Sequence, residues 1–466
     1  MQDLSAIIKA YDVRGVYPDQ LDEQLVYDVG AAFVEVVGAK TAVGGPGAVV
    51  VGHDMRPSGP ALVDAFTRGV TEAGCDVIQI GLCSTDGLYF ASGRLGLPGA
   101  MFTASHNPAK YNGIKLCRPG AAPVGEETGL AQIREMVATT RLPPVSEHPG
   151  TVRTQDMLAD YAGFLRSLVD ISQIRPLRVV VDAGNGMAGY TVPAVLGTEA
   201  GLPALPLTMM PMYFELDGTF PNHEANPIDP ANLVDLAQRV VSVGADVGLA
   251  FDGDADRCFV IDEKGNTVSP SAITAMIAKA MLVDHPGSTI IHNLITSRAV
   301  PEIIRENGGE PLRTRVGHSF IKAEMAKSGA VFGGEHSGHF YFRDFWRADS
   351  GMIAALHVLS TLGNTPVGTP LSTVVAEFSR YFDSGEINSV VAHPQAAMTS
   401  VREAFAEGNA VDEMDGLTIS APDWWFNVRP SNTEPLLRLN VEANDPNLLS
   451  RKADEVLAVI RGAQND

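Results

Sequence analysis

The sequence is poor in cysteine and has no long apolar run. Four cysteines are spread over 466 residues, and none lies in a C-x-x-C pair or at zinc-ligand spacing from histidine. We therefore expect free thiols in a reducing cytoplasm, not disulfides or structural zinc. The longest charge-free span, residues 351–376, is interrupted by glycine, proline, asparagine and threonine. It predicts helix, loop and helix instead of a membrane span. The N-terminal stretch has an early Asp3 and no apolar core, so no signal peptide is expected.

Positive charge is also scarce. The chain has 34 basic and 55 acidic residues, a formal net charge of −21. Such a surface repels nucleic acid and anionic membranes, so we expect neither as a partner. An anionic substrate would need a local cluster of arginine and lysine. The length is too great for one hydrophobic core and predicts two to four domains.

The order of strand-like and helix-like segments divides the chain into three similar thirds and a tail. Short β-branched runs followed by helix-like segments predict βαβ units, at 49–54, 179–186 and 288–296. A second set of strands runs into polar loops, at 99–108, 244–257 and 329–339. Ligands bind beyond the carboxyl ends of strands in open α/β sheets, so these loops should meet in one cleft. The tail reads as a small α+β domain. The predicted domains are 1–150, 151–256, 257–368 and 369–466.

Three aspartates alternate in the loop FDGDADR. Asp252, Asp254 and Asp256 would repel one another unless a cation neutralised them. Without histidine or cysteine among them, Mg²⁺, Ca²⁺ or Mn²⁺ is favoured over Zn²⁺. An EF-hand is one alternative because Glu263 is twelfth from Asp252, but Arg257 stands where that loop needs glycine. A solvated acidic turn is the other.

A serine and a histidine are adjacent in TASHNP, residues 103–108. His106 could act as a base for Ser105 in acyl transfer, but neighbouring side chains on an extended chain point apart. No G-x-S-x-G motif accompanies the pair. A metal site with room for a phosphate oxygen favours phosphoryl transfer instead, with the serine accepting and returning the group. An inert polar loop remains the alternative.

The third polar loop, GGEHSGH, spans residues 333–339. Glu335 and Ser337 offer a carboxylate and a hydroxyl, which suit neighbouring hydroxyls of a sugar because a carboxylate can accept two hydrogen bonds at once. A glycine-rich turn with surface histidines is the alternative interpretation.

The fourth polar loop, RPSNTEP, spans residues 429–435. It groups one guanidinium with three short hydrogen-bonding side chains, and another arginine follows on the next strand. Such a group is suited to binding a phosphate dianion. A β-hairpin turn is the alternative. The residues concerned are Arg429, Ser431, Asn432, Thr433 and Arg438.

Taken together, the motifs resemble the α-D-phosphohexomutase superfamily over nearly the whole chain. They occur in the family's order: KAYDVRG at 9–15, TASHNP, NGIK at 112–115, DGDADR, GEHSGH and RPSNTEP. The resemblance implies three related α/β domains with mixed sheets and a C-terminal α+β domain of TATA-binding-protein-like fold, arranged around one cleft. Many relatives have DGDGDR, whereas this chain has Ala255, which is small but lacks the backbone freedom of glycine.

The resemblance also implies roles for individual residues. Ser105 would be the phosphoserine, and an oxygen of its phosphate would join the three aspartates around Mg²⁺. Arg257 would help to neutralise phosphate. Glu335 and Ser337 would bind the sugar hydroxyls, and the fourth loop would bind the phosphate that does not react. Other cleft residues near the transferring group would be Arg14, His106, Lys115, His318 and His339.

The implied reaction is a phosphomutase cycle in the cytoplasm. Phospho-Ser105 would phosphorylate a hexose phosphate, a hexose 1,6-bisphosphate would turn over in the cleft, and its other phosphate would return to the serine. Lys115 and His339 are candidate bases. We expect a monomer or weak dimer. His336 stands where phosphoglucosamine mutases usually have glutamine, which favours mannose and also glucose phosphates as substrates. The alternatives are a phosphoglucosamine mutase, a metal-dependent sugar phosphatase and a sugar-phosphate binding protein without catalysis.

Overall fold

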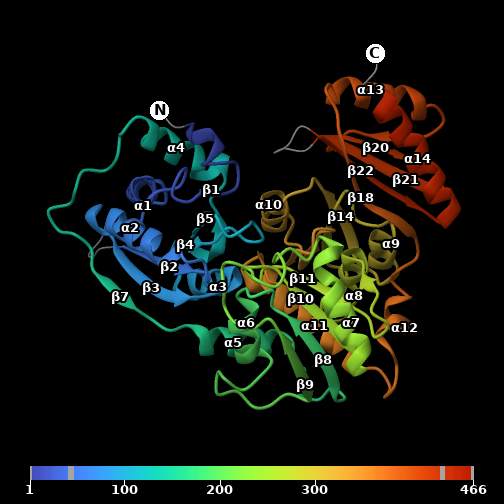
Figure 1. Ribbon diagram of the computed structural model, residues 1–466, viewed down its shortest axis with the longest axis horizontal. Helices are drawn as coiled ribbons and strands as arrows, with labels where there is room; N and C mark the ends of the chain where they lie inside the picture. The colour runs from blue at the N-terminus through green and yellow to red at the C-terminus, as the bar shows by residue number, and fades with distance from the viewer. Residues whose placement is uncertain (1–2, 40–46, 431–435, 463–466) are drawn as a thin grey trace.

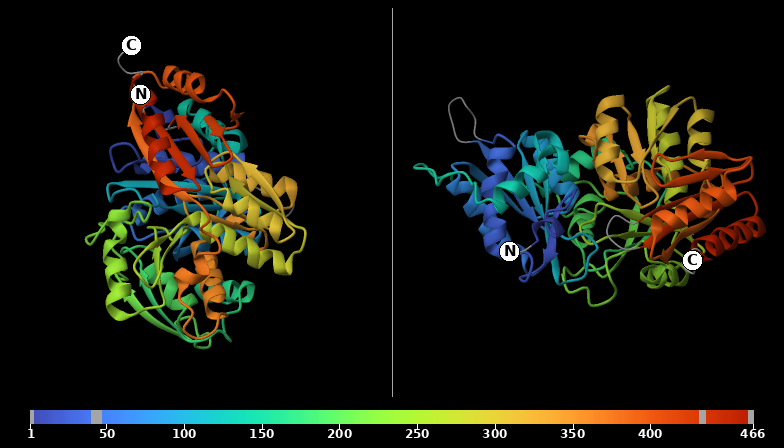
Figure 2. Two further views of the ribbon diagram at one scale, coloured as in Figure 1. Left: turned by 90° about the vertical axis from the view of Figure 1, so that its right-hand side faces the viewer. Right: turned by 90° about the horizontal axis from the view of Figure 1, so that it is seen from above.

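The computed structural model describes residues 3–39, 47–430 and 436–462. Its four β-sheets follow one another along the chain, and Figure 1 shows the first at one end and the fourth at the opposite upper corner. Seen from above, the fourth sheet lies beside the third (right panel of Figure 2). Within these described ranges, no helix combines the length and the apolarity needed to cross a lipid bilayer.

The first sheet is mixed and has the strand order β1-β5-β4-β2-β3-β7, with β6 paired to β5. Its strands are β1 (Val13–Val16), β2 (Ala48–His53), β3 (Asp76–Leu82), β4 (Gly99–Phe102), β5 (Tyr111–Arg118), β6 (Ala122–Pro123) and β7 (Val152–Thr154). Its helices are α1 (Glu23–Val36), α2 (Gly59–Glu72), α3 (Thr85–Leu95) and α4 (Ala131–Ala138). Asp22 caps α1 by accepting a hydrogen bond from the amide of Leu25 at 2.8 Å, as expected for an aspartate at a helix start.

The second sheet has the order β12-β11-β10-β8-β9. Its strands are β8 (Leu177–Asp182), β9 (Leu207–Met212), β10 (Val247–Phe251), β11 (Cys258–Ile261) and β12 (Thr267–Val268). Its helices are α5 (Leu158–Leu168), α6 (Ala188–Val195) and α7 (Val234–Val243). Every residue of β10 is buried, which explains why its sequence, VGLAF, is continuously apolar instead of alternating.

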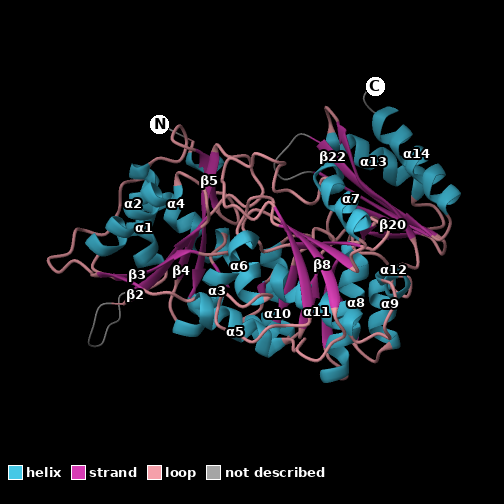
Figure 3. Ribbon diagram, turned by 60° about the horizontal axis from the view of Figure 1, so that its bottom comes forward, coloured by secondary structure: helices cyan, strands magenta, loops and turns pink. Residues whose placement is uncertain are grey.

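The third sheet has the order β14-β13-β15-β16-β17. Its strands are β13 (Thr289–Asn293), β14 (Glu310–Thr314), β15 (Phe332–Gly334), β16 (Phe340–Phe342) and β17 (Ala348–Asp349). The accompanying helices are α8 (Pro270–Asp284), α9 (Ala299–Glu306), α10 (His318–Ser328), α11 (Gly351–Gly363) and α12 (Leu371–Val375). Figure 3 shows helices packed beside the strands of these α/β units.

The first three sheets share one topology, which places three loops equivalently. The sets β3-β2-β4-β5, β9-β8-β10-β11 and β14-β13-β15-β16 have the same order. In each set the third strand is parallel to the second and antiparallel to the fourth. TASHNP, DGDADR and GEHSGH each connect that third strand to the fourth. The prediction of three related domains is therefore confirmed.

The fourth sheet is antiparallel throughout, in the order β18-β22-β21-β20-β19. Its strands are β18 (Phe382–Val390), β19 (Ala410–Asp412), β20 (Leu417–Ser420), β21 (Trp424–Pro430) and β22 (Leu436–Ala443). Two helices, α13 (Pro394–Phe405) and α14 (Pro446–Gly462), cover it and contribute to a separate apolar core. This is the small α+β domain that the sequence predicted.

The first three domains share one continuous apolar core. Three aromatic side chains show how they join: Phe90 of α3 lies 6.1 Å from Trp346, and Phe164 of α5 lies 5.3 Å from the same ring, between ring centroids. Such packing holds three loops from distant parts of the sequence in fixed relation.

The domain limits inferred from sequence stay a prediction, but the sheets bear on them. Strands β11 and β12 keep residues 258–268 in the second sheet, beyond the proposed division at 256. Helix α12 contributes Leu371 and Val375 to the core shared by the first three domains, although it lies in the fourth proposed segment.

Candidate active site

The TASHNP loop turns sharply after β4 and directs Ser105 toward the second domain. Ser105 has a φ of +49°, in the left-handed region, and its amide donates to Oγ1 of Thr103 at 2.9 Å. Its side chain is almost completely buried, and Oγ donates a hydrogen bond to Oδ2 of Asp252 at 2.9 Å. The serine of the first domain therefore touches the acidic loop of the second.

The three aspartates of DGDADR form a compact buried cluster. Each of Asp252, Asp254 and Asp256 offers a carboxylate oxygen within 4.8 Å of the others, and none is more than 1% exposed. Among the described residues, Oδ1 of Asp254 and Oδ1 of Asp256 accept no hydrogen bond. Buried carboxylate oxygens without donors fit a hard divalent cation. Ala255 adopts a φ of +61°, a conformation that costs an alanine about 1 kcal/mol.

Two cations lie against this cluster. Lys115 of β5 places Nζ 2.7 Å from Oδ2 of Asp254 and 2.6 Å from Oδ2 of Asp256. Burial disfavours the charged lysine, but the two carboxylates outweigh it and hold the pKa of Lys115 well above its ordinary value. Arg257 places Nη2 2.7 Å from Oδ2 of Asp252 and 3.3 Å from Oγ of Ser105. Lys115 thus places a positive charge against two of the aspartates, and Arg257 places one beside the hydroxyl of Ser105.

His106 is closer to Ser105 than the sequence argument allowed. Its Nδ1 lies 3.3 Å from Oγ of Ser105, so the expectation that the two side chains point apart is wrong. The positive φ of Ser105 is the reason, because the chain is not extended there. Nδ1 of His106 also lies 2.6 Å from Nη2 of Arg257, which makes it an acceptor. Burial and the Arg257 charge lower the pKa of His106 to about 2, so it is neutral.

The third loop reaches the same cluster through His339. Nδ1 of His339 lies 3.0 Å from Oδ2 of Asp349 and 3.8 Å from Oδ1 of Asp256, and an isolated β-bridge joins His339 to Arg257. Burial opposes the charged imidazole, but Asp256 and Asp349 outweigh it and raise the pKa of His339. Ser337 is partly exposed on the same loop.

The carboxylate of Glu335 is buried and already well bonded. Oε2 accepts from the hydroxyl of Tyr341 at 2.7 Å, and Oε1 accepts from Nδ2 of Asn293 at 3.2 Å and from the amide of Gly317 at 3.1 Å. Since an ionised carboxylate offers about four acceptor positions, this one keeps capacity for a ligand. The sugar-binding role of Glu335 and Ser337 stays a prediction.

The described part of the fourth loop is bound within its own domain. Nη2 of Arg429 lies 2.7 Å from Oε2 of Glu386, and Nη1 of Arg438 lies 3.5 Å from Oε1 of the same side chain. Ser431, Asn432 and Thr433 lie outside the described residues. His318 begins α10, and its side chain is likewise not described. The phosphate-binding role of the fourth loop stays a prediction.

A cavity of about 140 Å³ lies where the first three loops meet. Six of the residues that line it are Tyr11, Arg14, Ser105, Lys115, Arg257 and His339. Arg14 pairs with Asp12 at 2.5 Å and donates a hydrogen bond to Oδ1 of Asn107 in the serine loop. The structure thus brings the serine loop, the metal loop and His339 together with Arg14 and Lys115, whereas Glu335 and Ser337 of the third loop do not line this cavity.

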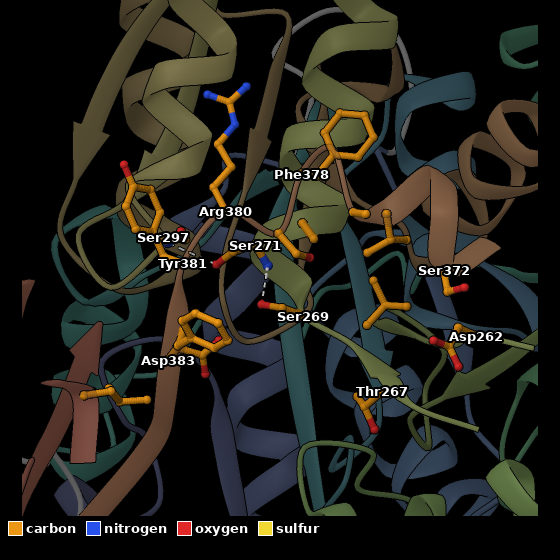
Figure 4. Close-up of a pocket in the computed structure, with 17 residues that line it drawn as sticks. Asp262, Thr267, Ser269, Ser271, Ser297, Ser372, Phe378, Arg380, Tyr381 and Asp383 are labelled. Carbon is orange, nitrogen blue, oxygen red and sulfur yellow. Dashed lines mark hydrogen bonds between the residues drawn. The ribbon is translucent and has the colours of Figure 1, made fainter. Parts of the chain in front are cut away.

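A larger cavity of about 460 Å³ lies elsewhere, between α8 and the segment that leads into β18 (Figure 4). Its lining carries hydroxyl groups such as Ser269, Ser271 and Ser372. None of the predicted site residues lines it, and it lacks the acidic cluster. The smaller cavity is therefore the better candidate for the reaction site, because Ser105 and Asp256 line it.

Sequence reasoning missed residues that support the acidic cluster. The hydroxyl of Thr85 donates to Oδ2 of Asp254 at 2.6 Å, and Asp349 binds both His339 and Lys322. Arg56 lies fully buried beneath the serine loop. In the sequence, only the positions of these residues could have indicated a role at the site. Arg56 and Thr85 each closely follow a strand of the first sheet, and Asp349 ends a strand of the third.

Family models match all four domains of the chain. Models of the phosphoglucomutase/phosphomannomutase family match residues 5–143 (α/β/α domain I), 159–265 (domain II), 269–381 (domain III) and 386–459 (C-terminal domain). A phosphomannomutase of Salmonella montevideo is 40% identical, covering 97% of this chain and 98% of that protein. Phosphohexose mutases of Xanthomonas campestris are 39% identical, covering 97% and 99%.

Solved structures point to the same family. A phosphoglucomutase/phosphomannomutase family protein of Burkholderia thailandensis has a TM-score of 0.87 and 32% identity, covering 99% of this chain and 98% of that one. The Paramecium phosphoglucomutase parafusin has a TM-score of 0.82 at 19% identity, covering 100% and 97%, which shows the shared fold. The chain described here belongs to the phosphoglucomutase/phosphomannomutase family of phosphohexomutases, which are phosphoryl-transferring isomerases.

Proposed function

We propose that this enzyme is a phosphomannomutase, interconverting mannose 6-phosphate and mannose 1-phosphate and also accepting glucose phosphates. One observation carries the proposal: Oγ of Ser105 lies 2.9 Å from Oδ2 of Asp252, inside a buried acidic cluster. A serine of one domain held against the carboxylates of another is the arrangement needed for a metal-assisted phosphoserine. The full-length phosphomannomutase relatives support the choice of substrate.

Asp252, Asp254 and Asp256 would hold Mg²⁺, together with a phosphate oxygen on Ser105. The oxygen-only donor set and the two Oδ1 atoms without hydrogen bonds fit this cation. When bound, it would neutralise charge on the transferring phosphoryl oxygens. Arg257, 3.3 Å from Oγ of Ser105, would add a second positive charge on the same oxygens.

The reaction would proceed in two balanced transfers. The free hydroxyl of a hexose phosphate attacks the phosphorus on Ser105, the bond from phosphorus to Oγ breaks, and the hydroxyl proton passes to a base. The resulting hexose 1,6-bisphosphate turns over, and its other phosphate returns to Oγ as the released sugar oxygen takes back a proton. Lys115 and His339 line the cavity beside Ser105 and are the candidate bases. His339 suits this role better, because, against the effect of burial, Asp254 and Asp256 raise the pKa of Lys115 and keep it protonated.

The sugar and the second phosphate would be held by the other loops. Glu335 and Ser337 would bind hydroxyls common to mannose and glucose, which differ only at C2, so one site would serve both sugars. Arg429, with Ser431, Asn432 and Thr433, would bind the phosphate that does not react. The fourth domain has its own apolar core, which supports a closing movement over the bound substrate.

Ser105→Ala tests the proposal, with Ser450→Ala on the exposed surface of α14 as the matched control. We expect intact mass and peptide mapping to find one phosphate on Ser105 in wild type and in the control, and none in Ser105→Ala. A coupled assay with mannose 6-phosphate, primed with a bisphosphate, should show mannose 1-phosphate formation lost in Ser105→Ala alone. Phosphate mapped to another residue would contradict the proposal, as would release of free phosphate without the 1-phosphate.

A further inference from the structure

Arg56 is a buried cation beneath the serine loop. It follows β2 and is 1% exposed. Nη2 donates to the carbonyl oxygens of Ser105 at 2.9 Å and Asn107 at 2.7 Å, and Nη1 donates to those of Pro108 at 3.0 Å and Tyr111 at 2.9 Å. One planar guanidinium therefore binds four carbonyls across the loop that carries Ser105. An ammonium group, with three donors on one atom, cannot reproduce this geometry.

The charge of Arg56 is balanced by Asp54, which lies two residues earlier in the chain. Asp54 accepts from the amide of Arg56 at 2.9 Å and from Nε at 3.2 Å, and both side chains are fully buried. Such a pair remains favourable only when its remaining donors are satisfied, and the four carbonyls satisfy them. The pair thus forms a fixed support between the end of β2 and the serine loop.

This support holds Ser105 in an unfavourable backbone conformation. The φ of +49° is uncommon for a residue other than glycine and persists only where surrounding contacts impose it. Both backbone groups of Ser105 are bound: its amide donates to Thr103 and its carbonyl accepts from Arg56. The side chain is then left pointing at Asp252 and Arg257.

The second domain covers Arg56 from the other side. The guanidinium carbon lies 5.3 Å from the centroid of the Phe220 ring, a cation–π arrangement. Gly218 packs so closely that an added Cβ would come within 2.7 Å of Cα of Arg56. Arg56 therefore lies where the serine loop and the second domain meet.

We propose that Arg56 is a positioning residue for phosphoryl transfer, which holds the nucleophile loop so that Oγ of Ser105 faces the acidic cluster. It does not line the cavity beside Ser105, and it acts through the backbone of Ser105. The inference rests on the proposed function, in which Ser105 carries the phosphoryl group. Replacement of Arg56 should therefore slow the chemical step without weakening the binding of hexose phosphate.

Arg56→Lys tests the inference, and Arg166→Lys is the matched control. Arg166 of α5 also donates to three carbonyls, those of Val195, Pro203 and Gly197, but lies outside the site. Folding is checked by circular dichroism and Tm, and kcat is expressed per folded molecule. We expect Arg56→Lys to lower kcat about 100-fold with KM for mannose 6-phosphate within about twofold of wild type. Arg166→Lys should change Tm but not kcat.

A second variant covers the case in which Arg56→Lys does not fold. Phe220→Leu removes only the ring beside the guanidinium and should lower kcat about tenfold, again at constant KM. If Arg56→Lys folds and keeps kcat within about threefold of wild type, the inference is overturned. If Arg56→Lys does not fold, the inference is overturned when Phe220→Leu keeps kcat within about threefold of wild type. Wild-type enzyme that carries no phosphate on Ser105 would instead defeat the proposed function, so the two failures are distinguishable.

Discussion

Gly253 lies between two aspartates of the metal loop, and replacing it should separate that loop from the nucleophile. Its φ is not positive, so alanine is acceptable to the backbone there. An added Cβ would, however, lie 2.4 Å from the carbonyl oxygen of Ser105 and 3.3 Å from its carbonyl carbon. Ordinary contact begins at 3.4 Å, so the two loops must separate by about 1 Å.

The carbonyl group of Ser105, which that Cβ would meet, cannot move away at low cost. It is backbone, and Arg56 and Thr103 bind both polar groups of Ser105. The hydrogen bond from Ser105 to Asp252, 2.9 Å in the structure, would therefore lengthen. A misplacement of about 1 Å costs up to about 100-fold in rate, and overpacking costs about 1–3 kcal/mol of stability. We expect Gly253→Ala to lower kcat in the coupled mutase assay by about that factor.

Gly163→Ala is the control for this prediction. Gly163 lies in α5, and the nearest atom to an added Cβ is Cδ2 of Leu202 at 3.9 Å. Alanine there should raise the free energy of unfolding by about 1 kcal/mol and leave kcat unchanged. The steric reasoning is refuted if Gly253→Ala retains wild-type kcat and unfolds at the wild-type denaturant concentration.

Two buried carboxylates give further predictions. Asp86 accepts hydrogen bonds from Ser84, Tyr161 and Ser350, and burial raises its pKa from 3.8 to about 6. The folded protein therefore binds a proton on Asp86 more tightly than the unfolded chain does. This proton binding stabilises the fold fully below about pH 4, and the stabilisation is lost as the pH rises through 6. We expect the free energy of unfolding of the wild type, measured against that of Asp86→Asn, to fall by up to about 3 kcal/mol between about pH 4 and pH 7. Parallel plots of unfolding free energy against pH for the two proteins would contradict this. Excess Mg²⁺ should raise the Tm of EDTA-treated wild type but not that of Asp254→Asn. At a Mg²⁺ concentration 100 times Kd, the expected stabilisation of the wild type is about 3 kcal/mol. An equal rise in both would exclude this aspartate as a ligand.

The sequence predicted the repeated part of the fold well. Buried parallel strands such as β10 are short continuous apolar runs, and a polar loop follows each, so their type and order could be read directly. The antiparallel strands were harder to place: β11 pairs antiparallel with β10, and β12 pairs antiparallel with β11, which local pattern does not reveal. Strand β18, with its many polar residues, was not predicted either, because it pairs with β22 far along the chain.

For the site, sequence identified the residues that carry unusual chemistry but not those that position them. The alternating aspartates are conspicuous because like charges crowded in one loop need a cation. Arg56 stands alone in its segment, and nothing local indicates that four carbonyls from residues 105–111 surround it. The relation of His106 to Ser105 was misjudged for a similar reason, because a single positive φ reversed the expected directions of the side chains.

The sequence by itself determined which groups are available: a serine hydroxyl and three carboxylates in loops that follow strands, and arginine and lysine cations in an acidic chain. Only the tertiary structure decided that the hydroxyl and the carboxylates touch. Residues 105 and 252 are brought to 2.9 Å by the apolar core that joins the first three domains and by the buried Arg56 that fixes the loop. Contacts between such distant segments depend on packing summed over whole domains, which no local pattern of residues contains.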